Sequence, residues 1–196
     1  MRGPRLAAGL ALFVLGLAAA APAQELSVSF GAGGFFPSEG AYREIYGSSL
    51  SFAGDIWLKL KGPFGFAAGF GRISDKGVAV PWIGDGTETY PVEFRRTSIP
   101  LLIFFQLDAG PVAIRLGAGA GVHSYRETWQ TVDLDFKGHK TSPRIVLAVS
   151  AALLKRGSLF CSANYESIGT GAGSPLAESI DLGGFQVLGG LAFRIF

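Results

Sequence analysis

Residues 183–196 read GGFQVLGGLAFRIF, and this stretch decides how the rest of the sequence is interpreted. Five of its large apolar side chains fall on one parity, at Phe185, Val187, Leu191, Phe193 and Ile195. The other parity carries Gln186, Gly190 and Arg194. Alternation with a period of two is typical of a β-strand with one apolar face. Because a closed sheet pairs its last strand with its first, we predict that this strand closes a sheet.

The composition favours an all-β chain in an apolar setting. Hydrophobic residues make up 48% of the sequence and charged residues only 16%, and there are 29 glycines. Soluble domains carry roughly 25% charged residues, so this chain is short of charge. The glycines argue against long helices, because each costs about 1 kcal/mol relative to alanine inside a helix.

The first 23 residues have the pattern of a secretory signal peptide. Arg2 and Arg5 are followed by an apolar run and by the small-residue site Ala21-Pro22-Ala23. We expect cleavage after Ala23, which divides the chain into residues 1–23, the signal, and 24–196, the mature domain. Removing two arginines leaves 15 Lys and Arg against 15 Asp and Glu, because the whole chain has 17 and 15. A mature charge of zero predicts no nucleic-acid surface.

Seven further segments show alternation, and strands are predicted over Glu25–Phe36, Ser49–Lys61, Phe64–Ile73, Glu93–Leu107, Val112–Arg126, Pro143–Leu154 and Leu159–Ile168. The sixth, by composition alone, is also compatible with a helix. Pro100 lacks a backbone N–H, so we expect a bulge or an interrupted ladder there.

Long loops and tight turns alternate between the predicted strands. The long loops are Pro37–Ser48, Ser74–Val92, Glu127–Ser142 and Gly169–Leu182, and one helical turn is expected around Tyr42–Tyr46. Alternation of Val132, Leu134 and Phe136 leaves open that the third loop is partly a hairpin. Eight strands with long connections on one side and short ones on the other predict an antiparallel up-and-down transmembrane β-barrel.

The sequence resembles the small eight-stranded outer-membrane barrels of the OmpA/OmpX type. The resemblance covers residues 24–196 and rests on the signal peptide, the strand rhythm, the Gly-rich strand LGAGAGVHSY and the C-terminal aromatic residue. It implies an outer-membrane location in a diderm bacterium and a C-terminal signal, Phe193 and Phe196, for the barrel-assembly machinery. Arg194 stands where the family usually has an aromatic or apolar residue.

Aromatic residues near the strand ends are predicted to form the two interfacial belts of such a barrel. The candidates are Phe36, Phe64, Tyr125, Trp129, Tyr165 and Phe193.

Polar residues on the parity opposite the apolar stripe are predicted to fill the lumen, which is just wide enough for side chains. They are Asp55, Lys59, Arg96, Gln106, Arg115, Arg144, Asn164, Glu166, Gln186 and Arg194. Five of these are cations and two are carboxylates. We expect Arg96 and Arg144 to reach solvent at the long-loop end. An anionic group in the mouth is the alternative.

Catalysis is not predicted. His123 lies beside Ser124 and near Glu127, but neighbours in a strand point to opposite faces, so these residues do not form a catalytic triad. No metal-ligand cluster or nucleotide-binding motif is present, and we expect no cofactor. Cys161 is read as a small buried or lipid-facing residue.

The sequence therefore predicts a non-enzymatic, monomeric outer-membrane barrel with a structural or surface-adhesion role through its four long loops. Its partners are expected to be outer-membrane lipids and an extracellular partner that the sequence does not identify. Two alternatives remain: a membrane enzyme that modifies lipid A, and a soluble secreted barrel that binds an apolar ligand.

Overall fold

The computed structural model describes residues 23–79, 89–131, 134–169 and 181–196. The predicted signal peptide lies outside the described residues except for Ala23, the first residue of β1. The strands are β1 (Ala23–Pro37), β2 (Ser49–Leu60), β3 (Phe64–Ala79), β4 (Tyr90–Ala109), β5 (Val112–Trp129), β6 (Leu134–Ala152), β7 (Gly157–Glu166) and β8 (Gly184–Arg194).

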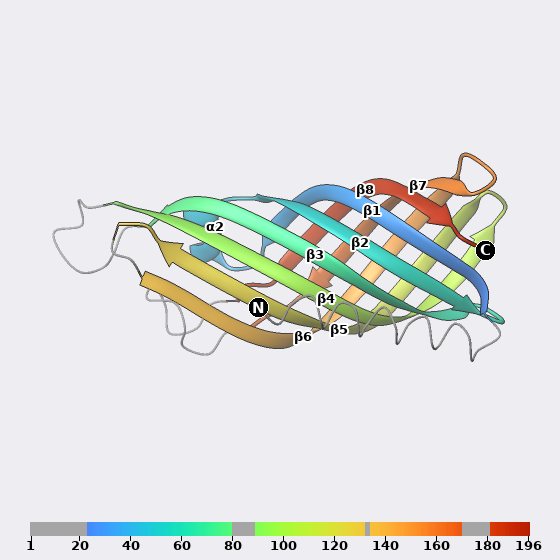
Figure 1. Cartoon of the computed structure of the whole chain (residues 1–196), viewed down its shortest axis with the longest axis horizontal. Helices are drawn as coiled ribbons and strands as arrows, with labels where there is room; N and C mark the ends of the chain where they lie inside the picture. The colour runs from blue at the N-terminus through green and yellow to red at the C-terminus, as the bar shows by residue number, and fades with distance from the viewer. Residues whose placement is uncertain (1–22, 80–88, 132–133, 170–180) are drawn as a thin grey trace.

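The eight strands form one closed antiparallel barrel in chain order (Figure 1). β8 pairs with β1 from Ser27 opposite Arg194 to Pro37 opposite Gly184, which confirms the predicted closing strand. Tight turns join β2 to β3, β4 to β5 and β6 to β7 at the end where the C-terminus lies. Gly62 and Gly110 take positive φ angles in the first two of these turns, as glycine does readily.

Strands β3 to β6 are longer than predicted and project beyond the other four at the long-loop end (Figure 1). The predicted loops Ser74–Val92 and Glu127–Ser142 are therefore wrong in part. The residues in them that belong to strands are 74–79, 90–92, 127–129 and 134–142. The helical alternative for RIVLAVSAALLK, residues 144–155, is also wrong, because β6 runs without a break to Ala152 and residues 153–155 after it are not helical. Of the suspected hairpin, residues 134–136 are strand and 132–133 lie outside the described residues.

Pro100 interrupts one ladder without shifting it. Partners between β3 and β4 stop at Ala68 opposite Leu101 and resume in the same register at Gly71 opposite Ser98. On its other side, Pro100 faces Gly121 of β5. The expected interruption is confirmed, and it involves no bulge.

The helix α2 (Gly40–Tyr46) lies in the first long connection, where a helical turn was predicted. It lies at the long-loop end of the barrel (Figure 1). Within the described ranges, no helix is both long and apolar enough to cross a lipid bilayer.

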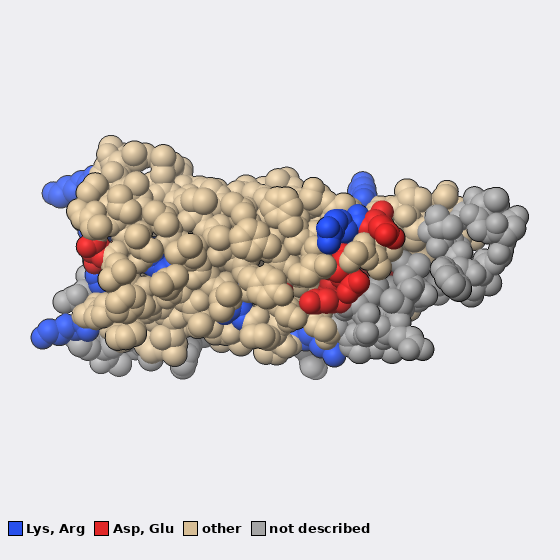
Figure 2. Space-filling model, turned by 180° about the vertical axis from the view of Figure 1, so that it is seen from behind, with Lys and Arg blue, Asp and Glu red and all other residues tan. Residues whose placement is uncertain are grey.

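The outer surface between the two ends is apolar. Large exposed side chains include Phe30, Phe52, Phe70, Ile103, Leu116, Ile145 and Leu191. Figure 2 shows charged residues gathered toward the ends and a broad middle band with little charge. Such a band needs an apolar surrounding, and only a closed sheet satisfies every backbone polar group there.

Four of the six residues predicted to form aromatic belts lie on the outer surface, and their position at the interfaces stays a prediction. Phe36, Phe64, Tyr165 and Phe193 are exposed on the outer surface. Trp129 is buried beside Ala79 and Val92, and Tyr125 packs against a buried cluster at the mouth, so neither belongs to a belt. Tyr125 and Trp129 are an even number of residues from His123 on β5, so their side chains point to the inside of the barrel, where His123 is buried.

Candidate functional site in the lumen and at its mouth

Two buried arginines share one carboxylate in the middle of the lumen. An Arg96 guanidinium N–H donates to one oxygen of Glu166, and Nη1 of Arg144 donates to the other oxygen at 3.2 Å. Arg96 is 2% exposed, Arg144 6% and Glu166 4%. Arg96 also donates to the carbonyl oxygen of Leu182. The expectation that Arg96 and Arg144 reach solvent is therefore wrong, because both donate to Glu166 inside the barrel and Arg96 donates also to the Leu182 carbonyl, while Nε of Arg144 is buried with no hydrogen-bond partner among the described residues.

Neutral polar groups extend this network around the lumen. Nε2 of His123 lies 2.9 Å from the Ser142 hydroxyl and 3.8 Å from Glu166. The Gln186 side chain accepts from Arg144 at 3.4 Å and from Asn164 at 3.3 Å. Its amide donates to Ser51 on the opposite side of the closing seam. The network thus joins β2, β4, β5, β6, β7 and β8 across the interior.

An apolar layer separates this network from the tight-turn end. It contains Trp57, Ala67, Leu102, Phe104, Val146 and Ala148. The Arg115 guanidinium lies 5.1 Å from the centre of the Trp57 ring. Such a stacked arginine is stabilised by the ring's negative face. Side chains therefore fill the lumen at this level.

A second polar layer lies at the tight-turn end. Arg115 donates to Gln106 at 2.7 Å and lies 3.4 Å from Glu25, which also pairs with Arg194 at 3.2 Å. Lys59 pairs with Asp108. A polar cavity of about 290 Å³ opens among these residues. Glu25 and Asp108 thus supply the carboxylates that the predicted lumen set lacked.

The mouth of the barrel is closed by a cluster around α2. Tyr42 is buried with Phe35, Ile73, Phe94, Ile168 and Leu182. Its hydroxyl donates to Asp75 at 2.7 Å, and Ser49 donates to the same carboxylate oxygen. Burial raises the pKa of Tyr42 well above its usual range, and the Asp75 charge raises it further. We call α2 with this contact the lid.

The structure brings most of the predicted lumen residues together. Asn164 and Gln186 are buried with the two central arginines, Gln106 and Arg115 are buried in the polar layer at the tight-turn end, and Lys59 and Arg194 lie at the rim. Asp55 shares the inward parity, opposite Ser29 and Gly69, and is partly buried. Phe193 and Phe196 are exposed at the tight-turn end, and the Phe196 carbonyl accepts from the Leu26 amide. Their role as an assembly signal stays a prediction.

Sequence reasoning missed the inward aromatic residues and the lid contact. Phe35 and Phe104 share the parity of small or polar neighbours, which is the signal that could have placed them inside, as it places Trp57 on the face of Asp55 and Lys59. Tyr42 and Asp75 are 33 residues apart, and both lay in predicted loops. A pattern of period two carries no information about such a contact.

The geometry gives little support for hydrolytic chemistry. His123 is wholly buried and its partner is Ser142, whereas Ser124 is exposed on the opposite face. Among the described residues, no group of His, Cys, Asp or Glu could hold a metal ion. Cys161 is exposed on the outer face and is not in a disulfide.

The fold, the apolar exterior and the interior filled with largely polar side chains together define a small transmembrane β-barrel of the outer-membrane class. Among solved structures, the chain is similar to OprG from Pseudomonas aeruginosa, with a TM-score of 0.70 and 11% identity over 89% of this chain and 97% of that one. It is also similar to neisserial surface protein A, with a TM-score of 0.57 and 16% identity over 86% and 94%. A third is Ail, the attachment invasion locus protein of Yersinia pestis, with a TM-score of 0.56 and 13% identity over 87% and 97%.

These likenesses show that the chain has the fold of small eight-stranded outer-membrane barrels. At such low identity they carry no activity to this chain. No protein-family model matches the sequence, and no curated protein matches it.

Proposed function

We propose that the protein is a non-enzymatic, non-conducting barrel of the outer membrane that acts through its long-loop end. One observation supports this most directly: the lumen is filled by the Arg96–Glu166–Arg144 network and closed by the lid. An eight-stranded barrel with a filled interior leaves the outer surface and the loops for contact with other molecules. Loops carry binding functions when a rigid scaffold positions them.

Adhesion at the cell surface is the role that we favour for this end. Strands β3 to β6 project beyond the rest of the barrel and would raise their connections above the bilayer. Ail, which shares the fold, is an attachment protein by name. We propose further that the chain is exported by cleavage after Ala23, is inserted as a monomer by the barrel-assembly machinery, and binds an extracellular partner.

The two alternatives have less support. A lipid A-modifying enzyme would need an accessible nucleophile and base, but His123 is enclosed in the lumen. A soluble barrel for an apolar ligand would need its apolar face inside, but the large apolar side chains are mostly outside. Unchanged lipid A in cells carrying His123→Ala, compared with the wild type, would argue against the enzyme.

The proposal is tested by location, conductance and adhesion. We expect the mature chain, beginning at Gln24, in the outer-membrane fraction, with faster gel migration before boiling than after it. In planar lipid bilayers the purified protein should give no steady conductance. Cells that express it should bind host-cell surfaces more strongly than cells whose variant lacks the tips of the long loops. A soluble periplasmic protein, or an open channel, would contradict the proposal.

A further inference from the structure

A group of exposed cations lies on one side of the barrel, on the outer face of its projecting strands. We call it the basic collar, and it consists of Arg72, Lys76, Arg95, Arg126 and Lys137, all exposed on the outward faces of β3 to β6. Arg95 faces Arg126 across β4 and β5, and Arg126 faces Lys137 across β5 and β6. Neighbouring strands lie about 4.8 Å apart, so these three cations cover about 10 Å.

The collar keeps a positive excess after its own ion pairs are counted. Asp135 accepts from Arg126 at 2.7 and 2.8 Å and pairs with Lys137 at 2.6 Å. Glu93 pairs with Arg95 at 2.6 Å. Among the residues that the structure describes, these five cations and two carboxylates leave an excess of three positive charges. The bidentate Asp135 contact occupies Nε and Nη2 of Arg126 and fixes the guanidinium plane, which leaves the Nη1 side for an anion.

The collar lies directly beside the apolar band. The next outward residues toward the apolar band are polar. They are Thr97, Ser124 and His139, which pair across the three strands and lie two residues from Arg95, Arg126 and Lys137. Two residues further are Ile99, Val122 and Thr141. On β4 and β5 the side chains therefore change from apolar to polar to cationic at one register, whereas on β6 the row opposite Val122 is still polar, at Thr141. This is the order in which a bilayer changes from acyl chains to headgroups.

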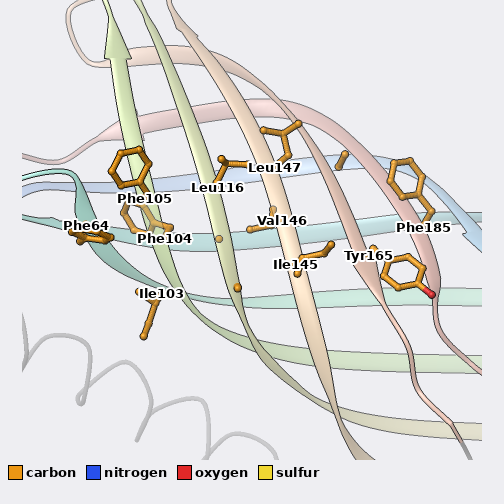
Figure 3. Close-up of a pocket in the computed structure, with 13 residues that line it drawn as sticks. Phe64, Ile103, Phe104, Phe105, Leu116, Ile145, Val146, Leu147, Tyr165 and Phe185 are labelled. Atoms are coloured by element: carbon orange, nitrogen blue, oxygen red, sulfur yellow. The ribbon is translucent and has the colours of Figure 1, made fainter.

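A groove of about 770 Å³ continues the same strands into the apolar band. Figure 3 shows Phe64 and Phe105 at one end of it and Tyr165 and Phe185 at the other. The small residues Ala118 and Ala163 also line it. Ala118 is eight residues from Arg126 along β5, which is about 26 Å along the strand. At a strand tilt of about 45°, the groove lies about 19 Å below the collar, near the bilayer midplane.

We propose that the collar and the groove together bind a lipid A-type glycolipid with two phosphates, its phosphates on the collar and one acyl chain in the groove. Each phosphate carries about 1.5 to 2 negative charges, so two match the collar's excess. The long-loop end faces the cell exterior in outer-membrane barrels, which selects an outer-leaflet lipid. The proposal rests on the outer-membrane placement proposed above.

A lipid fits these observations better than a sulfated glycan. The collar is on strand faces next to apolar residues, at headgroup depth, and the apolar groove lies on the same strands. A soluble glycan would use the collar alone. The groove therefore distinguishes the two ligands.

The test measures lipid binding by native mass spectrometry in nonionic detergent micelles, with the full mature barrel. Diphosphoryl lipid A should bind more tightly than monophosphoryl lipid A or phosphatidylglycerol. The triple variant R95Q/R126Q/K137Q should weaken its binding by at least about tenfold. The matched control K61Q/K155Q/R156Q removes three exposed charges at the tight-turn end and should bind as the wild type does. Heat-modifiable migration confirms that each variant is folded.

A second variant tests the groove without changing charge. Ala118→Phe should weaken diphosphoryl lipid A binding severalfold, and Ala151→Phe, on the outer face beyond the groove, should not. Equal binding by the collar variant and its control would overturn the proposal. The proposal would also be overturned if sucrose octasulfate or inorganic pyrophosphate bound more tightly than diphosphoryl lipid A and if that binding depended on the collar but not on Ala118. Failure of the outer-membrane placement would appear in cell fractionation instead, because the micelle assay does not depend on it.

Discussion

Glu166 is the residue on which both central arginines of the lumen depend. Its two oxygens accept from Arg96 and Arg144, and His123 lies within 3.8 Å. Burying charges costs free energy that a well-placed partner must offset. Losing one partner is therefore more harmful than losing an exposed ion pair, because it leaves a buried charge uncompensated.

Replacing Glu166 with Gln should destabilise the barrel by about 3–5 kcal/mol, because two buried guanidinium groups would lose the carboxylate that both of them contact. The measurement is reversible unfolding in micelles with increasing urea. Glu44→Gln is the control, because Glu44 is exposed on α2 and should change the free energy of unfolding by less than about 0.5 kcal/mol. Equal midpoints for the two variants would show that the central network contributes little to stability.

At the scale of elements, the lid depends on one buried phenol. Tyr42 contacts Phe35 and Phe94 edge to face, with ring centres 6.2 and 5.2 Å apart, and donates to Asp75. α2 has only seven residues, too short to be stable alone in water. Its position must come from this contact and from the packing of Ile45 and Tyr46 against the projecting strands.

The docked position of the lid should become less stable above about pH 10. A tyrosine exposed to water ionises near pH 10, whereas burial and the Asp75 charge keep Tyr42 neutral when docked. Because the pKa is higher in the docked state, its stabilisation is complete below pH 10 and falls as pH rises further, by up to about 1.4 kcal/mol per unit. A titration of phenolate absorbance should show a delayed phase that Tyr42→Phe reduces. The urea-unfolded chain, where all tyrosines ionise together, is the control, and a single phase near pH 10 in the folded protein would contradict the prediction.

Strand periodicity predicted the elements well where one face is apolar and failed where it is not. β8 and β1 were placed with the correct faces because each alternates large apolar and small or polar residues. The projecting parts of β3 and β6 have charged outward faces, including Lys76 and Lys137, and were read as loops. Parity also placed Arg96, Arg115 and Glu166 inside. Which of them meet depends on contacts such as Arg96 to Glu166, 70 residues apart, that only closure of the barrel creates.

At the scale of the whole molecule, closure depends on the close approach of β8 to β1. Gly190 faces Gly31 across this seam. A Cβ at Gly190 would collide with the Phe30 carbonyl oxygen and the Gly31 Cα, both of which are backbone and cannot rotate away. At Gly189, one residue earlier, the nearest atom to a Cβ would be the Phe160 carbonyl oxygen at 3.9 Å. The two adjacent glycines therefore form a matched pair.

Gly190→Ala should impair closure, and Gly189→Ala should not. Because the methyl group at residue 190 can be accommodated only by separating the two backbones, we expect a loss of about 1–3 kcal/mol in the free energy of unfolding. The folded fraction, measured as the fast-migrating band of unboiled protein after refolding into micelles, should fall for Gly190→Ala alone. Since both variants add one methyl group to the same strand, a similar loss for both would point to the flexibility of glycine and not to the β1–β8 contact. Full folding of Gly190→Ala would show that the seam can separate without cost.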